Sequence, residues 1–494
     1  MTSPYNSEGD TPPWHRDWML GAILLVAAIV RAAALSLPMR FDEAVTYVEF
    51  VRHPWWTVVS SYPYPNNHVF FSLLAKATTA LAPNEPWAIR LPAFAFGLAI
   101  VALTYGVGRA FFGRREGLIG AAFAATATPL VLYSVNARGY SIVAALFLAE
   151  LLIVQRLRSN PSRWKGWAAI AICAALGAYT IPVMLYPHGV IGVWLLMDWL
   201  RRRDHVTRTS LLRFGAATAA AAGAALLLYV PIIRHEGLGA LVGNKFVTPQ
   251  SWMSFATQMP RSLLATVIQW TDPLPFWLTP LAFVLAVAGV VRSRRMKRHE
   301  PSLAAAAAIW CGALLLATHR VPFMRIWIFL LPLYAVALAV GVVGVAERLF
   351  RSAASVTRRQ RTLGLALAPM LAVVLAGLSL NKRSLAATSE TGSFPEAPAI
   401  TAALKPRLRA GDRVLAPIPT NGPLLFYFVA EHVETGYFST REDAMRRAFI
   451  VLDTTRGQSL DWAVRVGMID PRRFARPRLV GRFGTAELWV SDAL

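Results

Sequence analysis

The stretch WMLGAILLVAAIVRAAALSLPMRFDEAVTYVEF (residues 18–50) begins with an apolar run and ends with charged residues. Its first part, residues 18–37, is interrupted only by Arg31 and is long enough to cross a hydrocarbon core of about 30 Å as a helix. Two adjacent carboxylates, Asp42 and Glu43, follow directly. The stretch therefore predicts a membrane-spanning helix that delivers two acids to the membrane surface, with Arg31 as a structural partner of a carbonyl or helix dipole.

Comparable apolar runs recur along most of the chain. Of its 494 residues, 55% are hydrophobic and only 16% are charged, whereas soluble domains carry about a quarter charged residues. The pattern predicts an α-helical polytopic membrane protein with about eleven transmembrane helices. They are expected near residues 18–37, 88–108, 116–134, 139–156, 165–181, 183–200, 213–232, 274–291, 302–318, 323–346 and 362–380.

The distribution of basic residues predicts the orientation. The net charge is +23, and much of it lies in short loops such as 156–165, 201–213 and 292–298. Cytoplasmic loops carry such an excess of Lys and Arg, so this pattern favours a multi-pass plasma (inner) membrane protein with a cytoplasmic N-terminus. It argues against a nucleic-acid partner. Residues 1–17 are expected to be a disordered cytoplasmic tail.

Two long connections on the predicted outer side interrupt this pattern. The outer loop 38–87 contains the apolar stretches EAVTYVEFVRHPWW and NHVFFSLLAKATTALA, which are too short to span and are expected to lie as helices in the interface. Residues 233–273 are polar and contain glycine, so they are expected to form a flexible loop.

The composition changes after residue 380. Residues 381–494 contain short β-rich runs (RVLAPIP, AFIVLDT, AELWVSD) between helical ones (PAITAALKPRLR, PLLFYFVA), which predicts a small α/β domain. Because the last span leaves on the outer side, this domain is expected to be extracytoplasmic. The expected organisation is thus a tail (1–17), a transmembrane domain (18–380) and a soluble domain (381–494).

Several polar side chains are predicted to share the outer rim with the two acids. Polar and charged groups at membrane depth are costly unless they are paired or functional. An outer cluster of carboxylates and cations suggests a site for an anionic substrate that needs a base, although each residue could instead cap a helix or contact lipid headgroups. The candidates beside Asp42 and Glu43 are Asn66, Asn67, His68, Arg138, Tyr140, His188, His319, Arg320 and Arg325.

Four motifs together resemble a known family. They are FDEAVTY after the first span, PNNHVFFSLL at an apolar helix, ARGYS at the head of the fourth span, and PFMRIWIFLLPLY before the tenth. In this order they are similar to the glycosyltransferase C superfamily, in the family 39-like branch related to protein O-mannosyltransferases and the lipid A aminoarabinose transferase. The likeness covers the first 160 residues best.

The resemblance implies a membrane glycosyltransferase that moves a hexose or pentose from a polyprenyl-phosphate donor to an acceptor hydroxyl at the outer membrane face, with inversion. It implies catalytic roles for Asp42 and Glu43 and places His68 and Arg138 near the donor phosphate. We expect Tyr140 and Arg325 to bind the donor phosphate as well. The remaining candidates, Asn66, Asn67, His188, His319 and Arg320, are expected to bind substrate.

Some assignments stay open at this point. The acceptor is a glycolipid, a polysaccharide or a protein, and no cofactor is certain, although a divalent metal bound by Asp42 and Glu43 is an option. The alternative function is a polytopic transporter or lipid flippase of the cell envelope, which predicts ionisable residues near the centre of the bilayer and broken helices. An assembly protein of the cell envelope without catalytic activity is a third reading.

Overall fold

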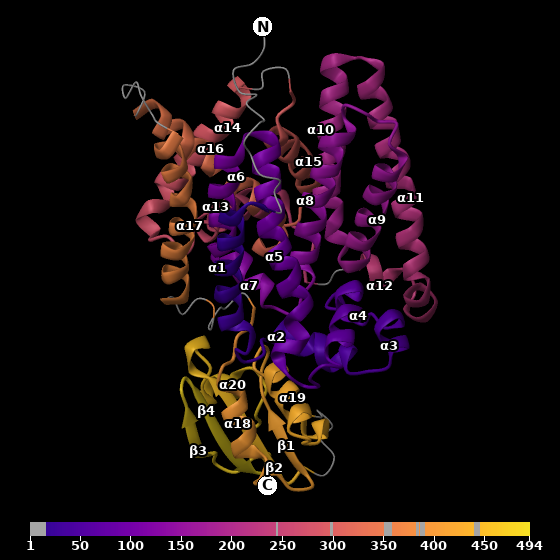
Figure 1. The fold of residues 1–494 in the computed structure, drawn as a ribbon. Coiled ribbons are helices and arrows are strands. Elements are labelled where there is room, and N and C mark those ends of the chain that lie inside the picture. The colour runs from indigo at the N-terminus through magenta and orange to yellow at the C-terminus, as the bar shows by residue number, and fades with distance from the viewer. Residues whose placement is uncertain are drawn as a thin grey trace.

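A computed structural model describes residues 16–243, 246–296, 300–349, 358–381, 385, 391–438 and 445–494. Long helices form a bundle, and a small domain with a sheet lies against one end of it (Figure 1). The arginine-rich link between α10 and α11 lies at the opposite end. The expected fold class, a helical membrane domain with a small C-terminal α/β domain, is confirmed.

Every predicted span coincides with helix in the structure. The helices concerned are α1 (Trp18–Leu35), α5 (Pro86–Phe111), α6 (Arg114–Thr126), α7 (Thr128–Ser134), α8 (Tyr140–Leu157), α9 (Trp164–Thr180), α10 (Leu185–Arg202), α11 (His205–Glu236), α14 (Thr279–Met296), α15 (Leu303–Thr318), α16 (Leu331–Leu349) and α17 (Arg358–Asn381). The 3-10 turns η4 (Pro182–Met184), η5 (Phe276–Leu278) and η6 (Met324–Leu330) precede α10, α14 and α16. Within the described residues, seven segments are long and apolar enough to cross a membrane, or eight if α6 and α7 form one bent span.

The third predicted span is broken in the middle. Helices α6 and α7 meet at an angle of 62°, beside Pro129 in the first turn of α7. Arg31 fills the gap: it is fully buried, and its Nη1 donates to the carbonyls of Ala27 and Ala125 at 3.2 and 2.7 Å. The expectation that Arg31 is a structural partner of backbone carbonyls is therefore confirmed.

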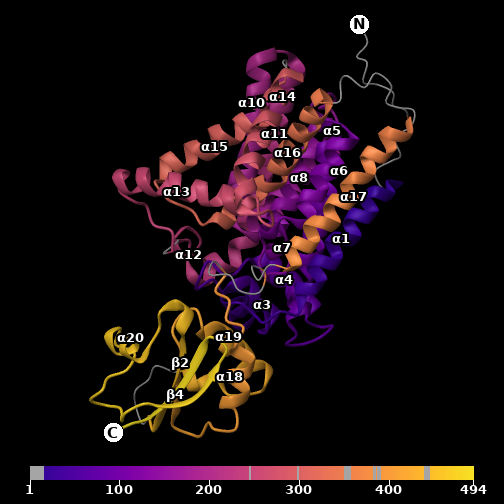
Figure 2. The same cartoon turned by 90° about the vertical axis from the view of Figure 1, so that its left-hand side faces the viewer.

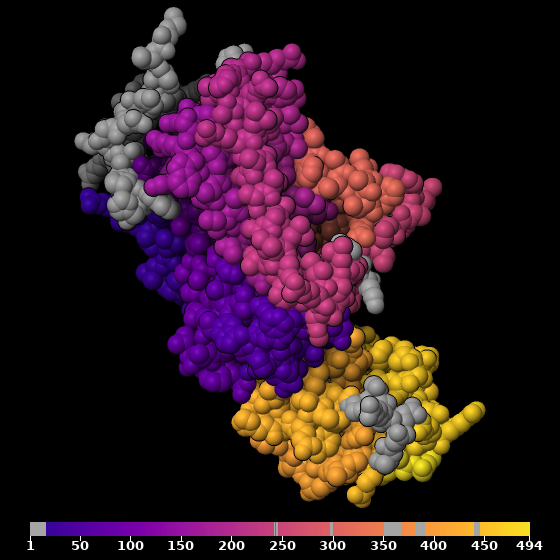
Figure 3. Space-filling model, turned by 90° about the vertical axis from the view of Figure 1, so that its right-hand side faces the viewer, coloured from indigo at the N-terminus to yellow at the C-terminus, as the bar shows by residue number. Residues whose placement is uncertain are grey.

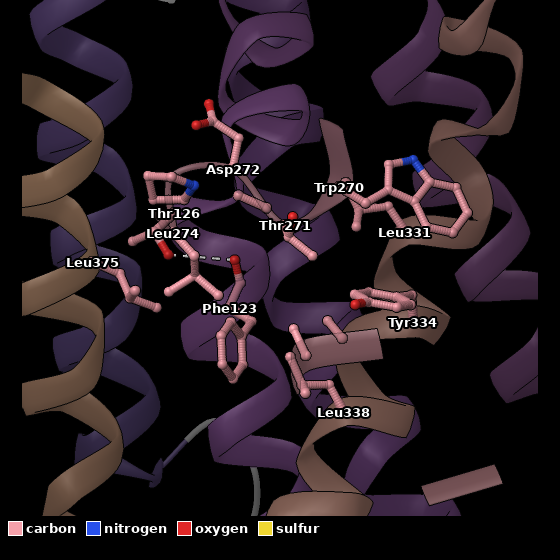
Figure 4. A pocket seen from close by; sticks show the side chains of 14 residues that line it. Phe123, Thr126, Trp270, Thr271, Asp272, Leu274, Leu331, Tyr334, Leu338 and Leu375 are labelled. Carbon is pink, nitrogen blue, oxygen red and sulfur yellow. Dashed lines mark hydrogen bonds between the residues drawn. The ribbon is translucent and has the colours of Figure 1, made fainter. Parts of the chain in front are cut away.

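A small cavity lies beside this break (Figure 4). Its volume is about 20 Å³, which is room for one water molecule. Thr126, Thr271 and Tyr334 are among its lining residues, and the Asp272 carboxylate points away from it. The cavity is too small for a sugar or a lipid.

The first outer loop folds into short helices at the end of the bundle that faces the soluble domain (Figure 1). They are α2 (Phe41–Thr46), the π-helical turn η3 (Tyr47–Val51), α3 (Trp55–Ser60) and α4 (Val69–Thr78). Trp55 and Trp56 expose 53% and 66% of their surface. The expected helices are present, as short pieces rather than two continuous helices.

The expectation of a flexible loop over residues 233–273 is wrong. Helix α11 continues to Glu236, and α12 (Gly239–Val242) and α13 (Trp252–Trp270) follow. Ser251 caps α13, since its side chain accepts from the Ser254 N–H. Phe255, Met259 and Thr266 are buried at helical spacing, so an amphipathic stripe stabilises this helix against the bundle.

The C-terminal domain has a four-stranded sheet with helices. Its elements are α18 (Ala397–Leu404), β1 (Asp412–Leu415), α19 (Asn421–Ala430), η8 (Thr435–Phe438), β2 (Arg447–Asp453), η9 (Thr454–Arg456), α20 (Leu460–Arg465), β3 (Arg478–Phe483) and β4 (Ala486–Asp492). The strand order is β1-β2-β4-β3, with β1 parallel to β2 and the other pairs antiparallel. All three predicted strands and both helices are present, and β3 is an additional strand.

The C-terminal domain packs on the first outer loop. In Figure 3 its orange and yellow surface meets the indigo and purple surface of that loop. Met39, Tyr47 and Phe71 of the transmembrane domain share one buried cluster with Phe426 of α19. The interface therefore lies beside the two acids that follow α1.

Candidate active site

The side chains of Asp42 and Glu43 occupy different environments. The Glu43 side chain is fully buried, and its oxygens accept from Arg90 Nε and Nη2 at 2.8 and 2.7 Å. The backbone N–H groups of Arg40 and Ala137 donate to it at 3.0 and 2.7 Å. Burial by itself raises the pKa of Glu43, but the charges of Arg90 and Arg40 and these hydrogen bonds together lower it. Glu43 is therefore an ionised carboxylate that is buried and fully engaged by its hydrogen-bond donors.

Asp42 instead lies at the open rim. Its side chain is 16% exposed, and a carboxylate oxygen lies 3.6 Å from Nη1 of Arg325. This distance is longer than a hydrogen bond, so the contact is an ion pair, and the Asp42 carboxylate stays partly exposed. Arg325 lies in η6, more than 280 residues after Asp42 in the sequence, so the fold brings two distant parts of the chain together here.

Tyr140 links Arg325 to the head of α8. Nε of Arg325 donates to the Tyr140 hydroxyl at 3.0 Å. The Tyr140 ring packs edge-on against the rings of His68 and Tyr133, with centroids 5.3 and 5.2 Å apart. Tyr140 and Arg325 are thus held together, and both belong to the same group as Asp42.

Arg138 is buried next to this group. Its Nη1 donates to the Asn66 carbonyl at 3.0 Å and approaches the Thr46 hydroxyl at 3.4 Å. Its Nε is buried without a hydrogen-bond partner in the described part of the chain. The side-chain amide of Asn66 in turn donates to the Asp42 carbonyl at 3.4 Å. A guanidinium with unused donors in this position is suited to an anion.

His68 has a defined protonation state. Its Nδ1 accepts from the backbone N–H of Gly139 at 2.8 Å, so the neutral ring carries its hydrogen on Nε2. Burial and the nearby charges of Arg138 and Arg325 hold the pKa of His68 well below its usual value. His68 is therefore a neutral hydrogen-bond donor at neutral pH, not a cation.

Several predicted site residues are not brought to this group. The Asn67 amide donates to the carbonyls of Val58 and Ser61 at 2.9 Å and shapes the loop before α4. His188 lies between Glu150 and Thr218, at 2.9 Å from each. Glu150 is ten positions beyond Tyr140 on α8, about 15 Å at 1.5 Å per residue. His188 therefore belongs to a separate polar pair inside the bundle.

His319 and Arg320 follow α15 directly. The His319 ring packs on the Trp252 ring with centroids 3.7 Å apart, and its carbonyl accepts from the Gln250 N–H at 2.9 Å. His319 thus connects α15 with α13. Arg320 is half-buried, and its Nε has no hydrogen-bond partner within the described residues. No described contact joins either residue to Asp42.

The sequence reasoning overlooked Arg90 and Arg40. Arg90 donates to the carbonyls of Leu35, Leu37 and Pro38 as well as to Glu43. Arg40 donates to the Val135 carbonyl at 2.9 Å. A signal was available, because Arg90 stands early in an apolar span (WAIRLPAF) and such a charge requires a partner.

An apolar groove has the turn η6 as one of its walls. Its volume is about 790 Å³, and its lining includes residues of α13, α14, α15 and α16. Two of these helices, α13 and α15, extend sideways from the bundle (Figure 2). Trp327 lines the groove at its η6 wall, only two residues after Arg325. The turn η6 therefore contributes Trp327 to the groove and Arg325 to the group around Asp42.

The comparisons with known proteins agree on one fold. Residues 66–232 match the family described as dolichyl-phosphate-mannose-protein mannosyltransferase. The crystal structure of ArnT from Cupriavidus metallidurans in the apo state is similar with a TM-score of 0.63 and 13% identity, over 97% of this chain and 98% of that one. Residues 66–232 therefore support a relationship to the family 39-like glycosyltransferases, and the whole chain shares the fold of ArnT.

Further solved structures share this fold. ArnT bound to undecaprenyl phosphate gives a TM-score of 0.61 at 13% identity, covering 96% of this chain and 98% of that one. An oligosaccharyltransferase of Archaeoglobus fulgidus, tethered to an acceptor peptide, gives 0.53 at 13% identity, covering 95% and 74%. No curated protein sequence matches the chain. The family match and the fold together indicate a multi-pass membrane glycosyltransferase.

Proposed function

We propose that the chain transfers a hexose or pentose from a polyprenyl-phosphate donor to an acceptor hydroxyl at the outer face of the plasma membrane. One observation carries this proposal: Asp42 lies at an open rim 3.6 Å from Arg325, while its neighbour Glu43 is buried in an ion-pair cluster. A single accessible carboxylate beside fixed cations is suited to transfer from a phosphate-linked sugar.

In the proposed reaction, the acceptor O–H loses its proton to the Asp42 carboxylate as its oxygen attacks the anomeric carbon. The bond between that carbon and the phosphate oxygen breaks, and its electron pair stays on the phosphate. Attack opposite the phosphate inverts the anomeric centre. Asp42 acts as the general base, a role worth roughly 10² to 10⁴ in rate.

The leaving phosphate gains negative charge and needs donors fixed in advance. Arg325 and the buried Arg138 supply charge, while Tyr140 and the Nε2–H of His68 supply neutral donors. At an effective dielectric of about 20, one charge contact near 4 Å contributes up to about 4 kcal/mol before desolvation. The apolar groove behind η6 would hold the lipid chain of the donor.

Glu43 receives a structural role in this proposal. Both of its carboxylate oxygens accept from Arg90, so in this proposal Asp42 alone takes the proton. The acceptor class stays open among glycolipid, polysaccharide and protein. We further propose that the N-terminus is cytoplasmic and that residues 381–494 form an extracytoplasmic domain.

A transfer assay tests the proposal. The purified full chain in detergent or nanodiscs is given undecaprenyl-phosphate pentoses and hexoses, and the release of undecaprenyl phosphate is measured with candidate acceptors. The wild-type protein should release undecaprenyl phosphate from one of these sugar donors. Asp42→Asn should reduce turnover by about 10² to 10⁴, with donor binding retained.

Glu49→Gln provides the matched control, because Glu49 is an exposed acid in the same outer loop. It should keep wild-type turnover. If Asp42→Asn retains more than about a tenth of the wild-type rate, a scale set by the usual effect of a general base, Asp42 is not the base. Vectorial movement of an intact lipid-linked sugar across the membrane, without release, would favour the flippase alternative.

A further inference from the structure

The three residues before Asp42 form hydrogen bonds with the C-terminal domain and with the segment that leads to it. The Met39 N–H donates to the Tyr427 hydroxyl at 3.1 Å. The Phe41 N–H donates to the Gly392 carbonyl at 3.0 Å, and Arg40 Nη2 donates to the Leu385 carbonyl at 2.8 Å. Three consecutive residues before Asp42 are therefore fixed from outside the transmembrane bundle.

Two glycines form a socket for Phe41. A Cβ atom on Gly392 would lie 2.6 Å from Phe41 Cβ, and one on Gly422 would lie 2.7 Å from Phe41 Cδ2 and 3.3 Å from the Phe41 carbonyl oxygen. Any larger residue would therefore displace the Phe41 side chain at its base or its backbone. The glycines allow α2 and the C-terminal domain to approach closely at the residue next to Asp42.

Aromatic packing next to the socket also joins the C-terminal domain to α2. Phe426, on the same helix as Gly422, is fully buried and packs edge-on against Tyr47 with ring centroids 5.2 Å apart. Tyr47 directly follows α2. The C-terminal domain thus holds α2 at its start through Phe41 and at its end through Tyr47, and Asp42 lies between these two contacts.

We infer that the C-terminal domain positions the Asp42 carboxylate, with Phe41 as the positioning residue and Gly392 and Gly422 as its socket. This inference rests on the proposed function of Asp42 as the base. The domain acts on the reaction by holding the reacting carboxylate in place, since displacement of a catalytic group by about 1 Å can cost about 10²-fold in rate.

Gly422 is the better position to test. Gly392 has φ of +65°, so alanine there would also strain the backbone. Gly422 lies in α19 without a positive φ, and alanine favours a helix over glycine. Loss of activity in Gly422→Ala would therefore not follow from a weakened helix. Gly436 in η8 is the matched control, because a Cβ there would meet nothing within 4 Å.

The first measurement is steady-state transfer from an undecaprenyl-phosphate sugar. Gly422→Ala should lower kcat by about 10²-fold, with the donor KM within about twofold because Arg138 is not displaced. Gly436→Ala should match wild type. Phe41→Leu has a smaller side chain and should restore most of the kcat in the Gly422→Ala background. The non-additivity of the two changes measures their contact.

Hydrogen–deuterium exchange of residues 40–47 separates this inference from the proposed function. The α2 amides should exchange faster in Gly422→Ala than in wild type or Gly436→Ala, and Phe41→Leu should reverse the change. This readout does not require transfer activity, so an inactive wild type with this exchange pattern overturns the proposed function alone.

Two results overturn the inference. One is unchanged α2 exchange in Gly422→Ala, whatever its activity. The other is a loss of kcat in Gly422→Ala that Phe41→Leu does not restore, together with a lowered unfolding temperature of Gly422→Ala. That result would show a general defect of the C-terminal domain.

Discussion

Asp42 and Glu43 are adjacent in sequence, and an α-helix turns successive side chains about 100° apart. In α2 this rotation directs Glu43 towards Arg90 in the protein interior and leaves Asp42 16% exposed beside Arg325. Two neighbouring carboxylates therefore have different surroundings, one buried and one partly exposed.

Arg138 allows a residue-scale prediction that separates phosphate binding from lipid contact. A guanidinium presents two parallel donors to a phosphate, whereas the ammonium group of lysine does not. Arg138→Lys should reduce transfer and raise the donor KM, and Arg138→Ala should abolish transfer with protein yield retained. Transfer of an undecaprenyl-phosphate sugar and the yield of folded protein are the measurements.

A role in contacting lipid headgroups would give a different pattern. Lysine extends to the membrane surface about as well as arginine, so Arg138→Lys would then keep full activity while Arg138→Ala would fold poorly. Arg163 in the α8–α9 link is an exposed control on the arginine-rich side. Arg163→Lys should leave transfer unchanged.

At the scale of elements, Glu43 joins parts of the chain that are distant in sequence. Arg90 comes from α5, Arg40 precedes α2, and the Ala137 N–H comes from the loop before α8. A buried charge cluster is stable only while both signs are present. The cluster fixes the direction in which the chain leaves α1, and hence the position of Asp42.

Glu43→Gln should therefore destabilise the protein. It leaves Arg90 and Arg40 buried without their counter-charge, and the loss of one partner of a buried pair costs about 3 to 5 kcal/mol. Thermal unfolding in detergent should show a lower midpoint than in wild type, while Glu49→Gln should be unchanged. A Glu43→Gln protein with wild-type stability but no turnover would instead assign Glu43 to the chemistry.

The pH dependence of stability follows from the lowered pKa of Glu43. Because the folded pKa lies below that of the unfolded chain, Glu43 stabilises the fold fully above the ordinary carboxyl pKa near 4.5. This contribution is lost as the pH falls through the folded value. Thermal melts from pH 7 down to pH 3 should show a steeper fall in wild type than in Glu43→Gln. Parallel curves would contradict this assignment.

At the scale of the whole molecule, α2 with Asp42 and the C-terminal domain lie at one end of the bundle, and the arginine-rich link between α10 and α11 lies at the other. Cytoplasmic loops are the basic ones. A cysteine at the exposed Glu434 should therefore react with a membrane-impermeant thiol reagent in intact cells. One at the exposed Arg294 should react only after permeabilisation.

The control for both variants is the parent protein with alanine at Cys173 and Cys311, which should not be labelled. Labelling of Arg294→Cys but not Glu434→Cys in intact cells would place Asp42 in the cytoplasm. That result would contradict a donor presented at the outer face.

The sequence by itself determined the helical segments, the α/β character of the C-terminal domain and the superfamily. These follow from long apolar runs, from short β-rich runs between helical ones, and from short motifs. It did not predict α13, because the apolar residues of an amphipathic helix are spaced along one face and do not form a continuous run.

The tertiary structure alone decided which polar residues meet. Asp42, Arg138 and Arg325 come together from three separated stretches. Asn67 is in the same motif as His68, and His188 was predicted on the same side of the membrane, but neither side chain contacts this group. The division between Asp42 and Glu43 depends on Arg90, 47 positions away, and the Phe41 socket depends on glycines more than 350 positions away. Charge pairing and close packing act through space, so their partners depend on how the helices pack.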